Sequence, residues 1–319
     1  MTLKTAQTKT VFIDGEAGTT GLEIRDRLAG ASDIAVRSID PEKRKDPQAR
    51  ATLMRDVDLV VLCLPDDAAK EAVALADGLG DKSPKIVDAS TAHRVASGWA
   101  YGFPELDAKQ AGTIAEATRV ANPGCYPTGG IALIRPLIDA GILPADYPIT
   151  VNAVSGYSGG GKSMIEAYEV AKSAASFELY GLGLEHKHVP ELQKYSRLER
   201  RPIFVPSVGN FRQGMLVSIP LHLDSLPGQP NLADIEETLA KHYNGSQLVS
   251  VVRDAAGVFK GRIAAEELNG TDAMQLAVFG NSGHRQAVLV ARLDNLGKGA
   301  SGAAVQNIRL MLGLEQTRS

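Results

Sequence analysis

The chain has 319 residues, 34 basic and 37 acidic side chains, and a formal net charge of −3. Hydrophobic residues make up 44% and charged residues 22%, which is the balance of a folded globular chain rather than a disordered one. This charge gives no reason to expect nucleic acid or a membrane surface as a partner, and no apolar run approaches the ~18 residues that span a bilayer.

The chain offers no sign of export or of disulfide cross-linking. Its first ten residues contain no apolar segment of the kind that a signal peptide needs. Its two cysteines, Cys63 and Cys125, are too few for a disulfide framework. We therefore expect a cytoplasmic enzyme of roughly two domains.

The first half of the chain alternates short apolar runs with helical segments. Strands are predicted over residues 10–14, 34–39, 57–64 and 85–89, and helices over residues 20–28 and 67–76. Continuous β-branched runs between helices are typical of a parallel sheet that is buried on both faces.

The second half of the chain has longer predicted strands, over residues 149–155, 215–221 and 286–293. Their length indicates a second and more antiparallel sheet. Helices are predicted over residues 131–140, 164–179 and 300–313, and the last of these could pack back on the first domain. The fold class is therefore α/β in the first half and α+β in the second.

A glycine-rich loop follows the first predicted strand. Gly15, Gly18 and Gly21 are spaced G-x-x-G-x-x-G between that strand and the first predicted helix. Glycines in this position let the backbone approach a pyrophosphate, and the helix N-terminus supplies free N–H groups and a positive dipole. The same glycines would suit an ordinary tight turn, but the strand and helix beside them favour a dinucleotide site.

The residues after the second predicted strand bear on which dinucleotide binds. Asp40 favours NAD, because an acidic residue there accepts the ribose 2′-hydroxyl. Ser38, Lys43 and Arg44 favour NADP, since hydroxyl and basic groups bind a 2′-phosphate. The basic residues would also suit a solvated loop, and the pattern as a whole favours NADP.

Residues 156–163 read G-Y-S-G-G-G-K-S and formally match the phosphate-binding P-loop. The match lies in the middle of the chain, behind a complete dinucleotide-type half. A glycine-rich loop can also line a cofactor or substrate pocket with backbone N–H groups. An ATPase stays open as an alternative at this point.

Cys125 lies in the stretch A-N-P-G-C-Y-P-T-G-G, directly before a predicted apolar helix. Pro127 fits a first helical turn, so Cys125 is expected at the helix N-terminus, where the dipole favours the thiolate. Cys63 lies inside an apolar strand and suits the role of a small buried hydrophobe. Cys125 is therefore the candidate nucleophile.

Six histidines compete as the base for this thiol, and the stretch H-K-H-V-P-E at residues 186–191 holds two of them. The H-x-H spacing could serve a metal, but neither cysteine stands in a matching context, so we predict no metal site. We expect one imidazole to act as acid and base for Cys125, with Glu191 orienting it.

Together these motifs resemble the N-acetyl-gamma-glutamyl-phosphate reductases, in the compact form usually called type 2. The resemblance rests on five stretches that span almost the whole chain: residues 15–21, 122–128, 155–162, 186–191 and 295–300. It implies a Rossmann-type NADP-binding domain over residues 1–124 and 295–319. It also implies an inserted α+β catalytic domain of mixed or antiparallel sheet over residues 125–294.

The resemblance implies roles for individual residues. Cys125 is the nucleophile, His188 the acid/base and Glu191 its partner. The residues implied to bind substrate are Arg94, His186 and Ser158. The residues implied to bind NADP(H) are Gly15, Gly18, Thr19, Thr20, Gly21, Ser38, Arg44, Ser90, Gly159, Gly160 and Asn295.

The implied reaction is the NADPH-dependent reduction of N-acetyl-L-glutamyl 5-phosphate to the 5-semialdehyde, a step of arginine biosynthesis. It runs through a thioester on Cys125 and needs no metal. The alternative is an enzyme like aspartate-semialdehyde dehydrogenase, acting on another acyl phosphate; a P-loop nucleotide-binding protein is a minor one. We expect a small-molecule substrate and a homo-oligomer, dimer or tetramer, and neither nucleic acid nor membrane as a partner.

Overall fold

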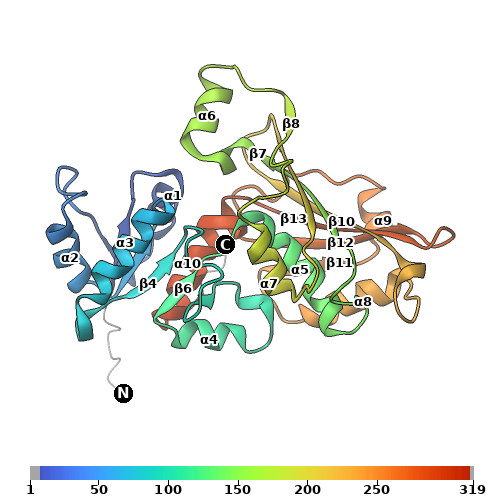
Figure 1. Cartoon of the computed structure of the whole chain (residues 1–319), viewed down its shortest axis with the longest axis horizontal. Helices are drawn as coiled ribbons and strands as arrows, with labels where there is room; N and C mark the ends of the chain where they lie inside the picture. Colours follow the sequence, from blue (N-terminus) through green and yellow to red (C-terminus); the bar gives the residue numbers. More distant parts are fainter. Residues whose placement is uncertain (1–7, 317–319) are drawn as a thin grey trace. The chain divides into compact units, whose positions relative to one another are not determined.

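The computed structural model describes residues 8–316, which form two compact units (Figure 1). Within that range the first unit comprises residues 8–104, 109–123 and 300–316, and the second comprises residues 105–108 and 124–299. The chain thus leaves the first unit, builds the second and returns. No helix between residues 8 and 316 is both long enough and apolar enough to cross a membrane.

The first unit is built on a six-stranded parallel sheet of order β2-β1-β3-β4-β6-β5. Its strands are β1 (Lys9–Asp14), β2 (Ile34–Arg37), β3 (Leu59–Leu62), β4 (Lys85–Asp88), β5 (Ala100–Tyr101) and β6 (Arg119–Ala121). The strand order reverses beside β1, with β2 on one side and β3 on the other. In open parallel sheets, ligands bind outside the carboxyl ends of the strands at such a reversal.

Helices cover both faces of this sheet. They are α1 (Thr19–Leu28), α2 (Pro47–Arg55), α3 (Asp66–Asp77), α4 (Gln110–Glu116) and α10 (Gly302–Met311). Val11 and Ile13 of β1 pack in one core with side chains of α1 and α10, whereas Phe12 packs in a second core with α2 and α3. The alternation follows from the two-residue period of a strand, and it confirms the predicted burial on both faces.

The second unit is built on a seven-stranded mixed sheet of order β11-β12-β13-β10-β7-β9-β8. Its strands are β7 (Thr150–Gly156), β8 (Phe177–Leu179), β9 (Ile203–Gly209), β10 (Met215–His222), β11 (Val249–Val252), β12 (Met274–Asn281) and β13 (Gln286–Leu293). The central strands β12, β13, β10 and β7 pair antiparallel, while β7 with β9 and β11 with β12 pair parallel.

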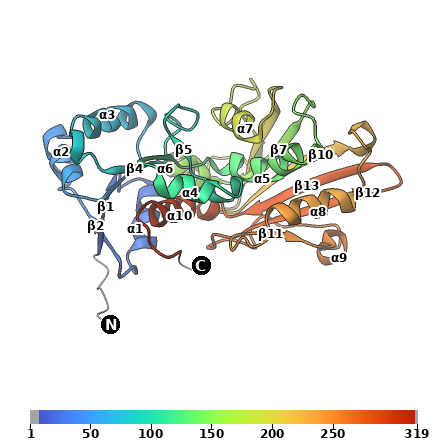
Figure 2. The same ribbon diagram turned by 90° about the horizontal axis from the view of Figure 1, so that it is seen from below.

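The helices of the second unit are α5 (Cys125–Asp139), α6 (Gly161–Glu169), α7 (Val189–Ser196), α8 (Leu232–His242) and α9 (Ala255–Phe259). Helix α5 lies against β10 and β13 and contacts α7 and α8 (Figure 2). Two glycines allow α5 to pack closely against its neighbours. A Cβ on Gly129 would lie 2.8 Å from the Val217 side chain, and one on Gly130 would lie 2.7 Å from the Leu192 side chain of α7. The start of α5 is therefore fixed against both the sheet and α7.

One predicted element is wrong. The helix expected over residues 164–179 ends at Glu169, and residues 177–179 form the edge strand β8, which pairs antiparallel with β9. Lys172 adopts a left-handed backbone with a φ of 50°, which breaks the helical path. No alternating apolar pattern marks the edge strand in the sequence, because all three of its side chains are exposed.

Other predicted elements are present with shifted ends. The strands expected over residues 34–39 and 57–64 are shorter, as β2 and β3, and the last helix starts at Gly302 after a π-helical turn, Gly297–Ser301. Helices α2, α4, α7 and α9 and strands β5, β6, β9, β11 and β12 were not predicted at all.

Gly15 is a position at which the backbone leaves no room for a side chain. Its φ is 92°, and a Cβ there would lie 2.2 Å from the carbonyl oxygen of Cys63. We expect Gly15→Ala to lower the free energy of unfolding by about 1–3 kcal/mol, because it combines backbone strain with a clash against main chain. Chemical denaturation measures the change. Gly30→Ala is the matched control, because a Cβ on Gly30 would meet nothing within 4 Å. Equal stability of the two variants would contradict the expectation.

Candidate active site

Cys125 is the first residue of α5, as the sequence predicted, and it forms no disulfide. Gly124 is the N-cap and offers no side chain to satisfy the helix N-terminus. The carboxylate of Glu191 instead accepts a hydrogen bond from the Gly124 N–H at 2.8 Å, and Glu191 is only 1% exposed. The thiol therefore lies where the helix dipole favours its nucleophilic, ionised form.

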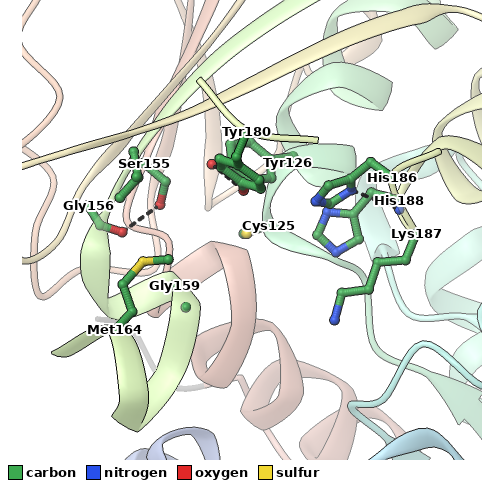
Figure 3. Close-up of a pocket in the computed structure, with 12 residues that line it drawn as sticks. Cys125, Tyr126, Ser155, Gly156, Gly159, Met164, Tyr180, His186, Lys187 and His188 are labelled. Atoms are coloured by element: carbon green, nitrogen blue, oxygen red, sulfur yellow. Dashed lines mark hydrogen bonds between the residues drawn. The ribbon is translucent and has the colours of Figure 1, made fainter. Parts of the chain in front are cut away.

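A cavity of about 240 Å³ opens beside this thiol, and its walls come entirely from the second unit (Figure 3). The lining residues are Cys125, Tyr126, Ser155, Gly156, Gly159, Gly160, Met164, Tyr180, His186, Lys187, His188 and Val208. The cavity thus combines a nucleophile, two imidazoles and an ammonium group with aromatic and glycine walls.

Both predicted histidines line this cavity. Residues 187 and 188 form a turn, and His188 is the N-cap of α7, so the chain here is not extended. The turn brings both side chains to the same cavity. Their ring centroids lie 4.7 Å apart, and Figure 3 shows both rings beside Cys125.

The two imidazoles differ in their hydrogen bonding. The His188 backbone N–H donates to Nδ1 of His186 at 3.1 Å, which places the proton of neutral His186 on Nε2. Burial and the neighbouring charge of Lys187 lower the pKa of His186 to about 4. His186 is therefore neutral at physiological pH, while its Nε2–H remains a donor.

Two tyrosines that the sequence analysis missed complete the wall behind the histidines. The Tyr180 hydroxyl donates to the Tyr126 hydroxyl at 3.1 Å, which donates in turn to the Ser207 carbonyl at 3.0 Å. Burial raises the pKa of Tyr180 to about 12 and that of Tyr126 still further. Both phenols therefore stay neutral. The position of Tyr126 directly after Cys125 was the one available signal.

The glycine-rich stretch after β7 forms a 3₁₀ turn, Tyr157–Gly160, and its backbone is already used. The N–H groups of Gly156, Tyr157 and Ser158 donate to the carbonyls of Gly214, Phe211 and Arg212. These three N–H groups are therefore not available to a phosphate. Gly159 and Gly160 instead line the cavity.

Asn295 ties this turn to the rest of the second unit. Its Nδ2 donates to the Ser158 hydroxyl at 2.9 Å, and its Oδ1 accepts from the Gly214 N–H at 2.8 Å. Ser158 and Asn295 are both 2% exposed. The structure thus brings two predicted site residues together, and the Ser158 hydroxyl keeps its own proton to donate.

The π-helical turn Gly297–Ser301 also approaches the thiol. A Cβ on Gly299 would lie 2.9 Å from the Cβ of Cys125. Beside it, the buried ammonium of Lys298 contacts both carboxylate oxygens of Glu105 at 2.8 Å. This ion pair anchors the turn to residues 105–108, and no sequence motif had indicated it.

The predicted dinucleotide residues of the first unit form a tight loop after β1. Gly18 caps α1 without a side-chain hydrogen bond, and Thr19 and Thr20 begin the helix. A Cβ on Gly21 would lie 2.5 Å from the Gly15 carbonyl oxygen, so the turn closes on itself. An uncapped helix N-terminus behind a glycine-rich loop fits a pyrophosphate.

The loop after β2 holds the predicted specificity residues. The Ser38 hydroxyl donates to a Glu16 oxygen at 3.1 Å, and Arg25 donates to the same oxygen at 3.0 Å. Asp40 is not at the strand end, and its carboxylate accepts the Glu42 N–H within its own turn at 3.0 Å. Arg44 is exposed. The Asp40 carboxylate, which would select NAD, thus accepts a hydrogen bond within its own turn and lies beyond the end of β2. This arrangement agrees with a preference for NADP.

Ser90 and Arg94 lie in the loop after β4, which folds around buried Asp88. Ser90 donates to Asp88 at 2.8 Å, and Nδ1 of His93 lies 2.6 Å from the same carboxylate oxygen. His93 also stacks on Trp99 with ring centroids 4.2 Å apart. Arg94 is 8% exposed and donates to the Ala89 carbonyl at 3.2 Å. The two predicted residues therefore share one rigid loop of the first unit.

The lowered pKa of His186 predicts a specific titration. We expect its imidazole to titrate near pH 4 in NMR spectra of histidine-labelled protein, with the signal assigned by its loss in His186→Asn. Between pH 6.5 and 4, His186 is protonated in the unfolded chain but still neutral in the folded chain. The free energy of unfolding therefore falls as the pH falls through this window. His186→Asn should lose less stability over that window. A His186 titration between pH 6 and 7 would contradict the burial argument.

Comparisons with known proteins agree with this architecture. The model of the semialdehyde dehydrogenase dimerisation domain matches residues 125–295, and that of the semialdehyde dehydrogenase NAD-binding domain matches residues 35–114. N-acetyl-gamma-glutamyl-phosphate reductases of Brucella ovis and Brucella abortus are each 58% identical over 307 residues, which is 95% of this chain and 98% of each relative.

Solved structures show the same fold. Aspartate semialdehyde dehydrogenase II of Vibrio cholerae superposes with a TM-score of 0.70 at 17% identity over 96% of this chain and 99% of that one. The Candida albicans enzyme, solved with NADP, gives 0.65 at 13% identity, over 96% of this chain and 99% of its own. The predicted fold class, a Rossmann-type domain with a second domain of mixed sheet, is confirmed. The chain belongs to the semialdehyde dehydrogenase family, and within it to the N-acetyl-gamma-glutamyl-phosphate reductases.

Proposed function

We propose that this chain is an NADPH-dependent reductase that converts N-acetyl-L-glutamyl 5-phosphate to N-acetyl-L-glutamate 5-semialdehyde and phosphate, a step of arginine biosynthesis. The observation that carries the proposal is the Cys125 thiol at the start of α5, in one cavity with two imidazoles. The high identity to reductases named for this substrate supports the choice of acyl group.

Cys125 provides the covalent step. Its thiolate attacks the acyl carbon, the sulfur–carbon bond forms, and the bond from that carbon to the phosphate oxygen breaks with its electron pair leaving on phosphate. The acyl group is then held as a thioester. The helix N-terminus and the Glu191–Gly124 hydrogen bond fix where this sulfur stands.

His188 is proposed as the acid and base. His186 is the poorer candidate, because its Nδ1 already accepts a backbone hydrogen bond and its pKa lies near 4. His186 would instead donate its Nε2–H to substrate. Glu191 lies in the first turn of α7, and its buried carboxylate holds the start of α5 by accepting the Gly124 N–H.

The residues present fit NADPH, because the glycine-rich loop after β1 leaves the N-terminus of α1 without a side-chain cap. When bound, NADPH supplies the reducing equivalents that turn the acyl group into the aldehyde. Gly15, Gly18, Thr19, Thr20 and Gly21 would hold its pyrophosphate, and Ser38 with Arg44 its 2′-phosphate. Ser90, Gly159, Gly160 and Asn295 are the remaining proposed cofactor residues. Arg94, His186 and Ser158 would bind the substrate.

We further propose a cytoplasmic homo-oligomer, a dimer or a tetramer. A reducing compartment keeps Cys125 as the free thiol that the chemistry needs. The matched domain model is named for dimerisation, and the edge strand β8 exposes Phe177 by 56% and Leu179 by 49%. Exposed apolar side chains on a sheet edge are suited to contact with another chain.

The proposal is tested with NADP⁺, inorganic phosphate and a panel of semialdehydes. We expect N-acetylglutamate semialdehyde to react with a far higher kcat/KM than aspartate semialdehyde, as NADPH absorbance and phosphate consumption report. Cys125→Ser should lose activity by at least about 10³-fold. Cys63→Ser is the control and should be nearly silent, because burial raises the pKa of Cys63 to about 12.

Two further variants divide the roles of the histidines. His188→Asn should reduce kcat by roughly 10²–10⁴, the usual contribution of a general acid and base. His186→Asn should act mainly on KM. Comparable rates on both semialdehydes would remove the substrate assignment, and an active Cys125→Ser would remove the thioester mechanism.

A further inference from the structure

We propose that Lys187 binds the phosphate group of the acyl phosphate and holds it as it leaves. The proposal rests on the proposed function, since that reaction brings an acyl phosphate to Cys125. It assigns to the second unit an anion-binding side chain of its own, distinct from Arg94 in the first unit.

Lys187 is the single lysine or arginine among the residues that line the cavity. Within residues 8–316, its ammonium makes no hydrogen bond or ion pair, and its charge is felt by His186. Figure 3 shows its side chain beside the two imidazoles, and the residue is exposed. An ammonium group in this position is available to a ligand.

The backbone beneath Lys187 is held firmly. The N–H of His188 donates to the His186 ring, and the N–H of Val189 donates to the His186 carbonyl at 3.0 Å. The turn is therefore fixed while the lysine side chain remains exposed. Lys298 offers the contrast, because it is buried and its ammonium is committed to Glu105.

The charge balance of the cavity calls for such a cation. The substrate brings a phosphate dianion close to a thiolate, and these two groups repel each other. His186 cannot offset this repulsion, because it is neutral at physiological pH. A permanent positive charge that faces the same cavity lowers the cost of binding the dianion and of releasing it with its extra electron pair.

The position of the carbon under attack identifies which anion Lys187 meets. The phosphate is bonded to the very carbon that Sγ attacks, so it must enter the cavity with that carbon. In an N-acetylglutamyl group, three carbons separate the α-carboxylate from the carbon under attack. A cation that shares a cavity with the thiol therefore meets the phosphate. Lys187 keeps its proton throughout and forms no covalent bond.

The first experiment uses the whole enzyme with NADP⁺, N-acetylglutamate semialdehyde and varied inorganic phosphate. Lys187→Met should raise the KM for phosphate by about tenfold or more, the loss expected for a hydrogen bond to a charged group. The KM for the aldehyde should change little. Lys187→Arg should recover most of the phosphate affinity. Lys241→Met, at an exposed position of α8, is the matched control and should match the wild type.

The second experiment needs no cofactor and no turnover. Iodoacetamide should alkylate Cys125 and spare Cys63, whose pKa is raised to about 12 by burial. Inorganic phosphate should protect Cys125 in the wild type and in Lys241→Met. In Lys187→Met, protection should require about tenfold more phosphate. Peptide mass spectrometry follows both cysteines.

The outcomes separate this proposal from the function on which it rests. A rise in the aldehyde KM with an unchanged phosphate KM would mean that Lys187 binds the carboxylate, and would overturn the proposal. Unchanged constants and unchanged protection in Lys187→Met would overturn it as well. If the wild type shows no phosphate-dependent activity, the proposed function fails, while the protection experiment still decides whether Lys187 binds phosphate.

Discussion

A buried hydrogen bond between the Glu191 carboxylate and the Gly124 N–H joins the two helices that carry the chemistry. Helix α5 presents Cys125 at its first position, and α7 carries His188 as its N-cap. The two bonded residues are 67 positions apart in sequence, so no local interaction would bring the two helix starts together. A charged acceptor buried at 1% exposure makes the bond costly to break, by about 1–3 kcal/mol or more.

Close packing around α5 makes this arrangement rigid. Gly129 and Gly130 allow β10 and α7 to approach the helix on two sides, and Gly299 allows a third segment to reach the nucleophile itself. In each case a Cβ would need space that a neighbouring atom occupies. These glycines therefore fix the position of the helix, and a nucleophile held in this way needs little reorganisation before attack.

The sequence predicted the features that depend on local chemistry. The glycine loop after β1 and the position of Cys125 at a helix start follow from turn and capping rules within a few residues, and both are present in the structure. The helix expected over residues 164–179 failed where a tertiary partner decided the outcome, since pairing with β9 turned its last part into an edge strand.

What the sequence could not show are contacts made across long separations. The Lys298–Glu105 pair joins positions 193 residues apart, and the Tyr180–Tyr126 hydrogen bond joins positions 54 apart. The Glu191 contact with Gly124 is of the same kind: the resemblance assigned Glu191 to His188, and the structure shows its carboxylate at the start of α5. The roles of the individual site residues stay predictions.

The central claim is that Cys125 carries the acyl group during the reaction, and trapping that intermediate tests it most directly. The enzyme is mixed with N-acetylglutamyl phosphate without NADPH, quenched in acid, and analysed by intact-protein and peptide mass spectrometry, with released phosphate measured in parallel. The account predicts one N-acetylglutamyl group per chain, located on Cys125, and one phosphate released for each. An unmodified Cys125, or an acyl group on any other residue, would contradict it.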